Sequence, residues 1–179
     1  MSHINGTLWV TGTHHSIFVV GYALRKLGYK ILNDIAWEKP NPPPNLSCRC
    51  FTHSTETLIW AARSDDTEHV FNYDLMRGIN SGRQMQTVWT LGAPAAEEKA
   101  SGQHPAQKPV ALVTRCLLAA TREGSLVLDP FLGSGTTAIA CLRTGRHFVG
   151  MDFCSSYVKS AVSRTRAELE RGKDLFIPR

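Results

Sequence analysis

The sequence predicts an α/β fold built on a mostly parallel sheet. Short apolar runs of strand length alternate along the chain with longer segments of helical period. Glycine or proline separates many of them, as at Gly28 and within residues 38–55. Such alternation is the pattern of a parallel sheet with helices packed on it. The 179 residues suffice for one domain with a sizeable core.

The first third of the chain predicts three strands and one helix. Ile17, Val20 and Leu24 recur near the period of 3.6 residues, and Gly28 ends the helix that they indicate. Residues 38–55 are rich in proline and asparagine, which predicts a loop. The expected elements are strands at 6–10, 30–37 and 57–62 and a helix at 16–27.

The remainder of the chain divides into an irregular part and a regular part. Residues 64–103 show weak periodicity and clusters of glycine, proline and alanine, which predicts an irregular insertion. Beyond it, Pro109 suits the first turn of a helix. The expected elements are helices at 109–120, 136–144 and 155–171 and strands at 125–128 and 147–151.

Composition limits the classes of protein to consider. The net charge of +5 and the pI near 9.1 suit a polyanionic partner. No apolar run approaches the ~20 residues of a membrane helix, and Met1–Gly6 does not read as a signal peptide, so we expect a cytoplasmic protein. The five cysteines are expected to be reduced thiols, and Cys48-Arg49-Cys50 lacks the spacing of a zinc site. His14-His15 is expected at a helix entry, and we expect no metal.

The most informative stretch is residues 125–137. An apolar strand leads into Asp-Pro-Phe (129–131), then Gly-Ser-Gly (133–135), then a helix start. Glycines let a ligand approach the backbone, and the first N–H groups of a helix attract a negative group. A second strand ends at Asp152, about 20 positions on, where α/β nucleotide sites place the acceptor for ribose hydroxyls. Alone, this stretch fits a nicotinamide or flavin oxidoreductase, or a tight turn without a ligand.

A second motif, His-Pro-Ala-Gln-Lys-Pro at 104–109, argues against the oxidoreductase. With Asp-Pro-Phe-Leu-Gly-Ser-Gly-Thr-Thr at 129–137, it resembles the amino-methyltransferases of DNA, which methylate adenine N6 or cytosine N4 with S-adenosylmethionine. The order of the two motifs is that of the circularly permuted beta class, and the similarity runs from about residue 5 to about residue 171. The resemblance implies a Rossmann-like S-adenosylmethionine-dependent methyltransferase sheet, incomplete, with a C-terminal-type antiparallel strand pair, in a single partial domain over 1–179.

The resemblance implies a cofactor site around these motifs. Asp152 can accept from the ribose hydroxyls, and Asp129 can face the amino group of the cofactor or instead cap the following turn. Thr136 and Thr137 can cap the helix and donate to a carboxylate. Residues of the 104–109 run approach the methionine moiety by resemblance, although Lys108 could be a plain surface charge. The candidate cofactor residues are Asp129, Phe131, Gly133, Ser134, Gly135, Thr136, Asp152, His104, Gln107 and Lys108.

The catalytic motif of the family, Asp/Asn/Ser-Pro-Pro followed by Tyr, Phe or Trp, is not found. Asn41-Pro42-Pro43-Pro44 ends in proline instead of the aromatic residue that stacks on the flipped base. In the beta order the motif would lie upstream of Gly6, so we expect the chain to be a C-terminal part: a fragment or one half of a split protein. A strand would then be absent between those of Leu126 and Leu8. Its absence would leave a gap of roughly 9–10 Å between two exposed apolar edges.

By resemblance, residues 64–103 correspond to the variable region that reads DNA. Arginine can read guanine, and asparagine or glutamine can read adenine. Three lysines and arginines stand against six acidic residues in this segment, a net of −3 that also fits a plain surface loop. The candidate DNA contacts are Arg77, Arg83, Gln84 and Arg49, with Phe71, Asn72, Tyr73, Asn80, Ser81, Gln86, Trp89, Lys39 and His53 as further candidates.

Together these features predict a site-specific DNA methyltransferase that acts on double-stranded DNA. Adenine N6 is preferred because it is the more frequent target in the family. The alternatives are cytosine-N4 methylation and an inactive remnant that binds DNA or a partner.

Overall fold

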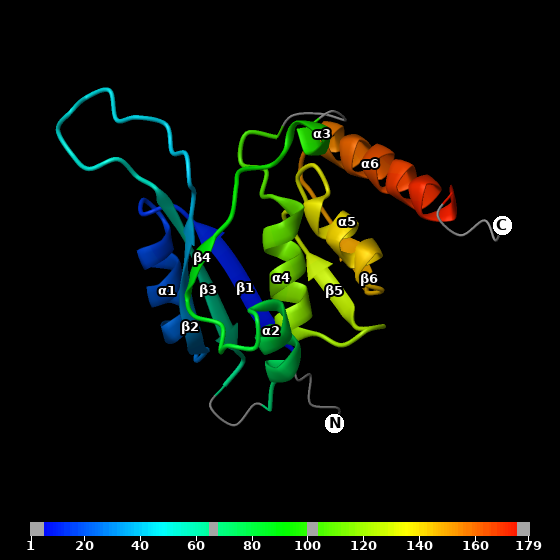
Figure 1. The fold of residues 1–179 in the computed structure, drawn as a ribbon, viewed down its shortest axis with the longest axis horizontal. Helices are drawn as coiled ribbons and strands as arrows, with labels where there is room; N and C mark the ends of the chain where they lie inside the picture. The colour runs from blue at the N-terminus through cyan, green and yellow to red at the C-terminus, as the bar shows by residue number, and fades with distance from the viewer. Residues whose placement is uncertain (1–5, 65–67, 100–103, 175–179) are drawn as a thin grey trace. The chain divides into compact units, whose positions relative to one another are not determined.

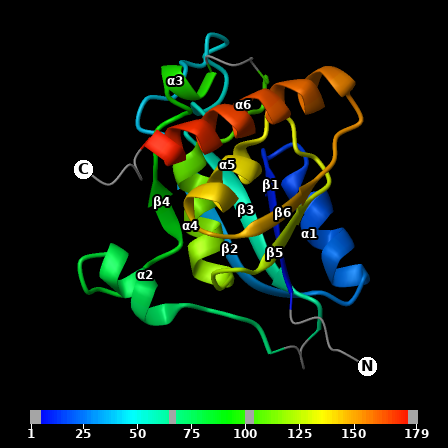
Figure 2. The same ribbon diagram turned by 90° about the vertical axis from the view of Figure 1, so that its right-hand side faces the viewer.

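A computed structural model describes residues 6–64, 68–99 and 104–174. The chain forms two compact units, an N-terminal unit of residues 1–92 and a C-terminal unit of residues 93–179. Figures 1 and 2 show the ribbon in two views.

The N-terminal unit is a four-stranded sheet in the order β1-β3-β2-β4. Its strands are β1 (Thr7–Gly12), β2 (Lys30–Glu38), β3 (Thr55–Ala62) and β4 (Val88–Thr90). The strand β3 runs antiparallel to both β1 and β2, whereas β2 and β4 are parallel. One reversed strand therefore lies among three that share a direction. This mixture of parallel and antiparallel strands agrees with the expected α/β fold and its antiparallel strand pair.

The helix α1 (Ile17–Lys26) packs on this sheet. Its apolar stripe buries Ile17 and Leu24 against Ile59 and Ala61 of β3. Because the buried positions fall on one side of the helix, its other side carries exposed residues. The helix has the boundaries that its apolar spacing predicts to within one residue.

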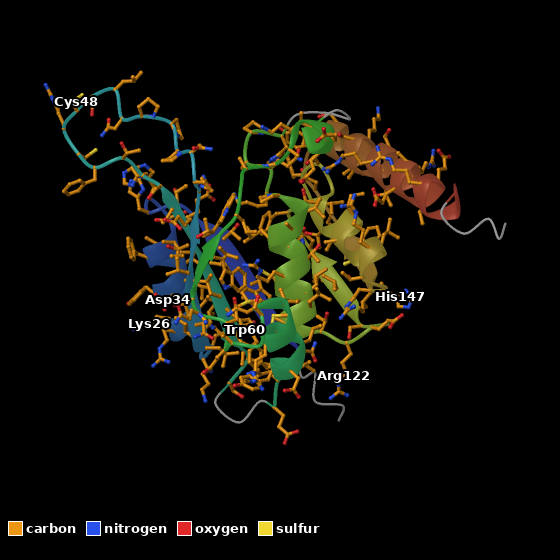
Figure 3. All side chains as sticks on the ribbon, in the orientation of Figure 1. Lys26, Asp34, Cys48, Trp60, Arg122 and His147 are labelled. Atoms are coloured by element: carbon orange, nitrogen blue, oxygen red, sulfur yellow. The ribbon has the colours of Figure 1, made fainter. Side chains whose placement is uncertain are left out.

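A long loop, residues 39–54, connects β2 to β3. The side chain of Asn45 organises it: the amide nitrogen donates to the carbonyl of Cys50 at 2.8 Å, and Oδ1 accepts from the N–H and hydroxyl of Ser47. Figure 3 shows Cys48 at the far end of this loop, beyond the strand ends. The loop therefore projects from the end of the sheet at which β1 and β2 finish and β3 starts.

The expectation of an irregular segment over 64–103 is wrong for part of its length. The described part contains α2 (Tyr73–Ile79), β4 and the single turn α3 (Ala96–Lys99). The three-residue β4 exists because it pairs with β2, with Trp89 opposite Trp37. Such pairing is a tertiary effect, and it leaves no periodicity in so short a run.

The C-terminal unit is built on two parallel strands, β5 (Leu126–Asp129) and β6 (His147–Gly150). Three further helices follow the expected order: α4 (Val110–Ala120), α5 (Thr136–Arg143) and α6 (Ser155–Asp174). One core cluster joins α4 and α5 to the inward side chains of the strands. Its members are Val110, Leu117, Ile139, Ala140 and Cys141, with Val113, Val127 and Phe148 packed against them.

In the described residues, β5 pairs only with β6, and β1 pairs only with β3. Each therefore has one unpaired edge. Leu126 and Leu128 of β5 are 69% and 60% exposed. By the family resemblance, these are the two strands expected on either side of an absent strand. Among the residues described, no helix is both long and apolar enough to cross a bilayer.

Candidate functional site

The glycine turn, residues 129–135, is fastened to the end of β6. The N–H of Leu132 donates to the carbonyl of Met151 at 2.8 Å, and the N–H of Gly133 donates to Oδ2 of Asp152 at 2.8 Å. Gly135 has a φ of 85° and precedes the first residue of α5 as its N-cap. The carboxyl ends of β5 and β6 and the start of α5 therefore meet at one place, where open α/β sheets bind ligands.

The carboxylate of Asp152 is a charged acceptor at this place. Its other oxygen, Oδ1, accepts from the N–H of Cys154 at 2.9 Å. The backbone N–H groups of Cys154 and Gly133 lower the pKa of Asp152 below its usual range, and the nearby His104 acts in the same direction. Each carboxylate oxygen keeps a second acceptor position, so the side chain can still receive hydroxyl donors from a ligand.

Packing within the protein also restricts the two glycines of the turn, in addition to the expected approach of a ligand. A Cβ on Gly135 would lie 2.8 Å from Cβ of Ala161, so α6 occupies the space. A Cβ on Gly133 would lie 3.3 Å from the ring of His104. The backbone of the turn is therefore in close contact with α6 and with the 104–109 run.

Asp129 has the second of its two expected roles, whereas the two threonines do not cap the helix as expected. Asp129 caps the turn: Oδ1 accepts from the N–H of Phe131 at 3.0 Å, and Oδ2 accepts from the hydroxyl of Thr137 at 2.6 Å. The hydroxyl of Thr136 donates to the carbonyl of Lys108 at 3.2 Å. Neither threonine caps α5, because Gly135 occupies the N-cap position. These hydroxyls stabilise the turn itself.

The 104–109 run packs directly on the glycine turn. Oε1 of Gln107 accepts from the hydroxyl of Ser134 at 2.9 Å, and the ring of His104 stands edge-on to Tyr157 with centroids 4.5 Å apart. The C-terminal unit thus brings all ten candidate cofactor residues to two adjoining segments and the end of β6. They are separated by up to 48 positions in the sequence, from 104 to 152.

Two residues that sequence reasoning did not select belong to this place. Phe153 directly follows Asp152 and is fully exposed, and Phe131 is 87% exposed. Its position after the acidic residue was the only signal in the sequence. Arg164 of α6 is buried, and its guanidinium donates to Ser134. A helix with this many charges predicts only a solvated face, so no signal marked Arg164.

The candidate DNA contacts do not form one surface. Arg49 lies in the loop 39–54, which connects the end of β2 to the start of β3. Arg77 belongs to α2, and Arg83 and Gln84 follow α2, after the opposite end of β3. Figures 1 and 2 both show α2 and this loop at opposite ends of the sheet.

Several candidates for DNA contact have structural roles within the protein. The guanidinium of Arg77 donates to the carbonyl of Gly82 at 3.0 and 3.2 Å and so closes the turn after α2. Trp89 is buried, and its indole N–H donates to the carbonyl of Gln86. Nζ of Lys39 lies 2.5 Å from Oε1 of Glu56. Arg49, Arg83 and Gln84 are exposed.

Three histidines lie close together at the carboxyl end of β1, where His14 stacks on His53 and is tilted against His15. The ring centroid of His14 lies 3.8 Å from that of His15 and 3.9 Å from that of His53. Loss of surrounding water, followed by the charges of His15 and His53, lowers the pKa of His14. His14 and His15 directly precede α1, as expected for a helix entry. Within the described residues, no group of His, Cys, Asp or Glu side chains is arranged to hold a metal ion.

The comparison with known families decides the class of protein. A family model described as DNA methylase (N6 and N4 methyltransferases) matches residues 3–163. The chain belongs to this DNA methylase family. The resemblance inferred from the two motifs is therefore confirmed.

Individual relatives agree with this assignment. The chain is 52% identical over 167 residues to the Type II methyltransferase M2.DpnII of Streptococcus pneumoniae, covering 93% of this chain and 62% of that protein. It superimposes on M1.HpyAVI, solved as a complex with SAM, with a TM-score of 0.78 and 29% identity over 90% of this chain and 75% of that one. The cytosine-N4-specific PvuII DNA methyltransferase shares the fold, with a TM-score of 0.73 and 17% identity over 93% and 70%. This DNA methylase chain thus spans less than two thirds of the length of M2.DpnII.

Proposed function

We propose that this chain supplies the cofactor-binding part of a Type II, site-specific DNA methyltransferase that transfers a methyl group from S-adenosylmethionine to a base amino group. The observation that carries the proposal is the glycine turn after β5, bonded to Asp152 and packed on the 104–109 run, in a member of the DNA methylase family. The relative M1.HpyAVI, solved with SAM, has the same fold.

The free groups of the site fit S-adenosylmethionine. Asp152 would accept from the ribose hydroxyls, and the exposed rings of Phe131 and Phe153 offer apolar faces at the strand ends. The first N–H groups of α5 have no partner within the helix and would receive a carboxylate. Asp129, Ser134, Thr136 and Gln107 would act by fixing the turn, since their side chains are bonded within the protein. When bound, the cofactor supplies an activated methyl group on its sulfonium.

The target is double-stranded DNA, and adenine N6 is the preferred acceptor. Adenine is preferred because it is the more frequent target in the family. The likeness to the cytosine-N4 enzyme, at 17% identity, concerns the fold alone. Arg49 would contact phosphate, and Arg83 and Gln84 would read bases, because all three are exposed. The reducing cytoplasm suits the five free cysteines.

No residue of this chain is assigned as the hydrogen-bond acceptor for the amino group of the target base. Asn41 lies in the loop 39–54 and is exposed, but Pro44 offers no π-face to a flipped base. We therefore expect the part of the methyltransferase that the alignment with M2.DpnII leaves uncovered to carry the acceptor. It would also pair the unpaired edges of β1 and β5.

Three experiments test the proposal. Calorimetry should detect binding of S-adenosylmethionine by the chain and no binding of NAD. Transfer of labelled methyl groups to DNA should require the remaining part of M2.DpnII, added as a fusion or as a second chain. Mass spectrometry of the digested DNA should find N6-methyladenine.

Other outcomes would overturn specific parts of the proposal. N4-methylcytosine in the digest would replace adenine by cytosine. Binding of NAD in place of S-adenosylmethionine would reject the cofactor. Robust transfer by the 179-residue chain alone would reject the need for a further segment and make Asn41 the first residue to substitute.

A further inference from the structure

A buried cation, the guanidinium of Arg164, is hydrogen-bonded to the glycine turn. Arg164 projects from α6 and is 7% exposed. Its Nη1 donates to the carbonyl oxygen of Ser134 at 2.7 Å and to the hydroxyl oxygen of Ser134 at 3.0 Å. Both acceptors belong to the middle residue of the Gly-Ser-Gly sequence. A side chain 30 positions away thus determines the direction of that peptide.

Burying a guanidinium at this position costs free energy. Moving a cation out of water costs free energy unless strong acceptors receive it. In the described residues no carboxylate lies within ion-pair distance of Arg164, although Glu98 and Glu168 lie near enough to favour its charge. An apolar residue could pack at the same position without that cost. What the arginine adds is directional bonding to Ser134.

The bonding continues from Ser134 to the 104–109 run. The hydroxyl of Ser134 accepts from Arg164 and donates to Oε1 of Gln107 at 2.9 Å. Nε2 of Gln107 donates to the carbonyl of Glu98 at 2.9 Å, and Oε2 of Glu98 accepts from the N–H of Val110 at 2.9 Å. One chain of hydrogen bonds therefore links α6, the glycine turn, α3 and the start of α4.

We propose that Arg164 is a positioning residue, which holds the glycine turn and the 104–109 run in their binding arrangement before the cofactor arrives. This inference rests on the proposed function of the turn. The bond from Arg164 to the Ser134 carbonyl fixes the orientation of the peptide between Ser134 and the N-cap residue Gly135. This orientation directs the first N–H groups of α5 toward the site. A site formed in advance loses less entropy on binding, so its affinity is higher.

The test compares three substitutions in the full chain. Arg164→Met removes the donors and keeps a long side chain, Arg164→Lys keeps the charge with a different geometry, and Arg166→Met removes an exposed arginine from the same helix. Circular dichroism establishes that each variant is folded. Calorimetry measures the affinity for S-adenosylmethionine, and hydrogen exchange with mass spectrometry measures protection of peptides covering 131–139 and, as a reference, 55–62.

We expect Arg164→Met to weaken binding about tenfold or more, since it removes bonds to a charged donor. Exchange should rise in 131–139 and stay unchanged in 55–62. Arg164→Lys should recover part of both effects, and Arg166→Met should change neither. A folded Arg164→Met variant with unchanged affinity and unchanged exchange at 131–139 would overturn the inference. If the unaltered chain does not bind S-adenosylmethionine, the proposed function fails, and the exchange comparison still decides whether Arg164 orders the turn.

Discussion

The carboxylate of Asp152 accepts the N–H of Gly133 at 2.8 Å, which fixes the glycine turn to the end of β6. An acidic residue that the sequence assigns to a ribose therefore also maintains the shape of the turn. The bonds that hold the turn and the proposed bonds to a ribose use the same oxygen atoms. Substitutions at Asp152 must be interpreted with both in mind.

Asp152→Ala should weaken the binding of S-adenosylmethionine about tenfold, because it removes a ligand acceptor and releases the N–H groups of Gly133 and Cys154. Calorimetry measures the change. The control is Glu170→Ala, which removes an exposed carboxylate from α6. Equal affinity of the Asp152→Ala variant and the unaltered chain would place the cofactor elsewhere.

Gly135→Ala should destabilise the protein by about 2–4 kcal/mol, because it combines an unfavourable positive φ with overpacking. The added methyl would lie 2.8 Å from Cβ of Ala161. Gly124→Ala is the matched control: Gly124 has a φ of 75°, and a Cβ there would meet nothing within 4 Å. It should cost only the backbone strain, roughly 1 kcal/mol. Urea unfolding measures both variants, and equal losses would show that α6 does not confine the turn.

The ion pair between Arg143 and Glu168 should make stability depend on pH in the acidic range. The guanidinium contacts both carboxylate oxygens, at 2.6 and 3.0 Å, and joins α5 to α6. The hydrogen bond from Arg143 lowers the pKa of Glu168, so the folded protein releases this proton more readily than the unfolded chain does. The stabilisation is therefore complete above the unfolded pKa and is lost as the pH falls through the lower, folded pKa.

Glu168→Gln should cost about 1 kcal/mol at pH 7, since Arg143 is partly exposed and water screens the pair. The difference from the unaltered protein should disappear as the solution is acidified below the ordinary range of a glutamate. Glu170→Gln, on the same helix but exposed, should show no such dependence. Denaturant unfolding at a series of pH values tests this, and a constant difference at every pH would exclude a titrating Glu168.

Arg77 and Arg83 should respond differently to substitution by alanine. Arg77→Ala should lower stability by about 1 kcal/mol, because its guanidinium holds the carbonyl of Gly82. Arg83→Ala should leave stability unchanged and, in the active methyltransferase, relax the choice of sequence. Thermal unfolding and sequencing of methylated sites measure the two effects. A stability loss for Arg83→Ala alone would reverse the roles of the two arginines.

The sequence by itself determined the strand–turn–helix unit around residues 125–152 and the adjoining 104–109 run. These features depend on local chemistry: apolar runs of strand length, glycines where the chain turns, and helical periodicity. The two motifs also sufficed to identify the family. All expected helices and strands of the C-terminal unit lie within a few residues of their predicted limits.

Only the tertiary structure decided how side chains far apart in the sequence meet. No local pattern in the sequence marks Arg164, because its role depends on its hydrogen bonds to Ser134. Those bonds form only when α6 packs on the turn. The strand β4 exists through its pairing with β2, and the reversed β3 separates Arg49 from Arg77. Such contacts depend on which surfaces the folded chain brings together, and no short stretch of sequence records that.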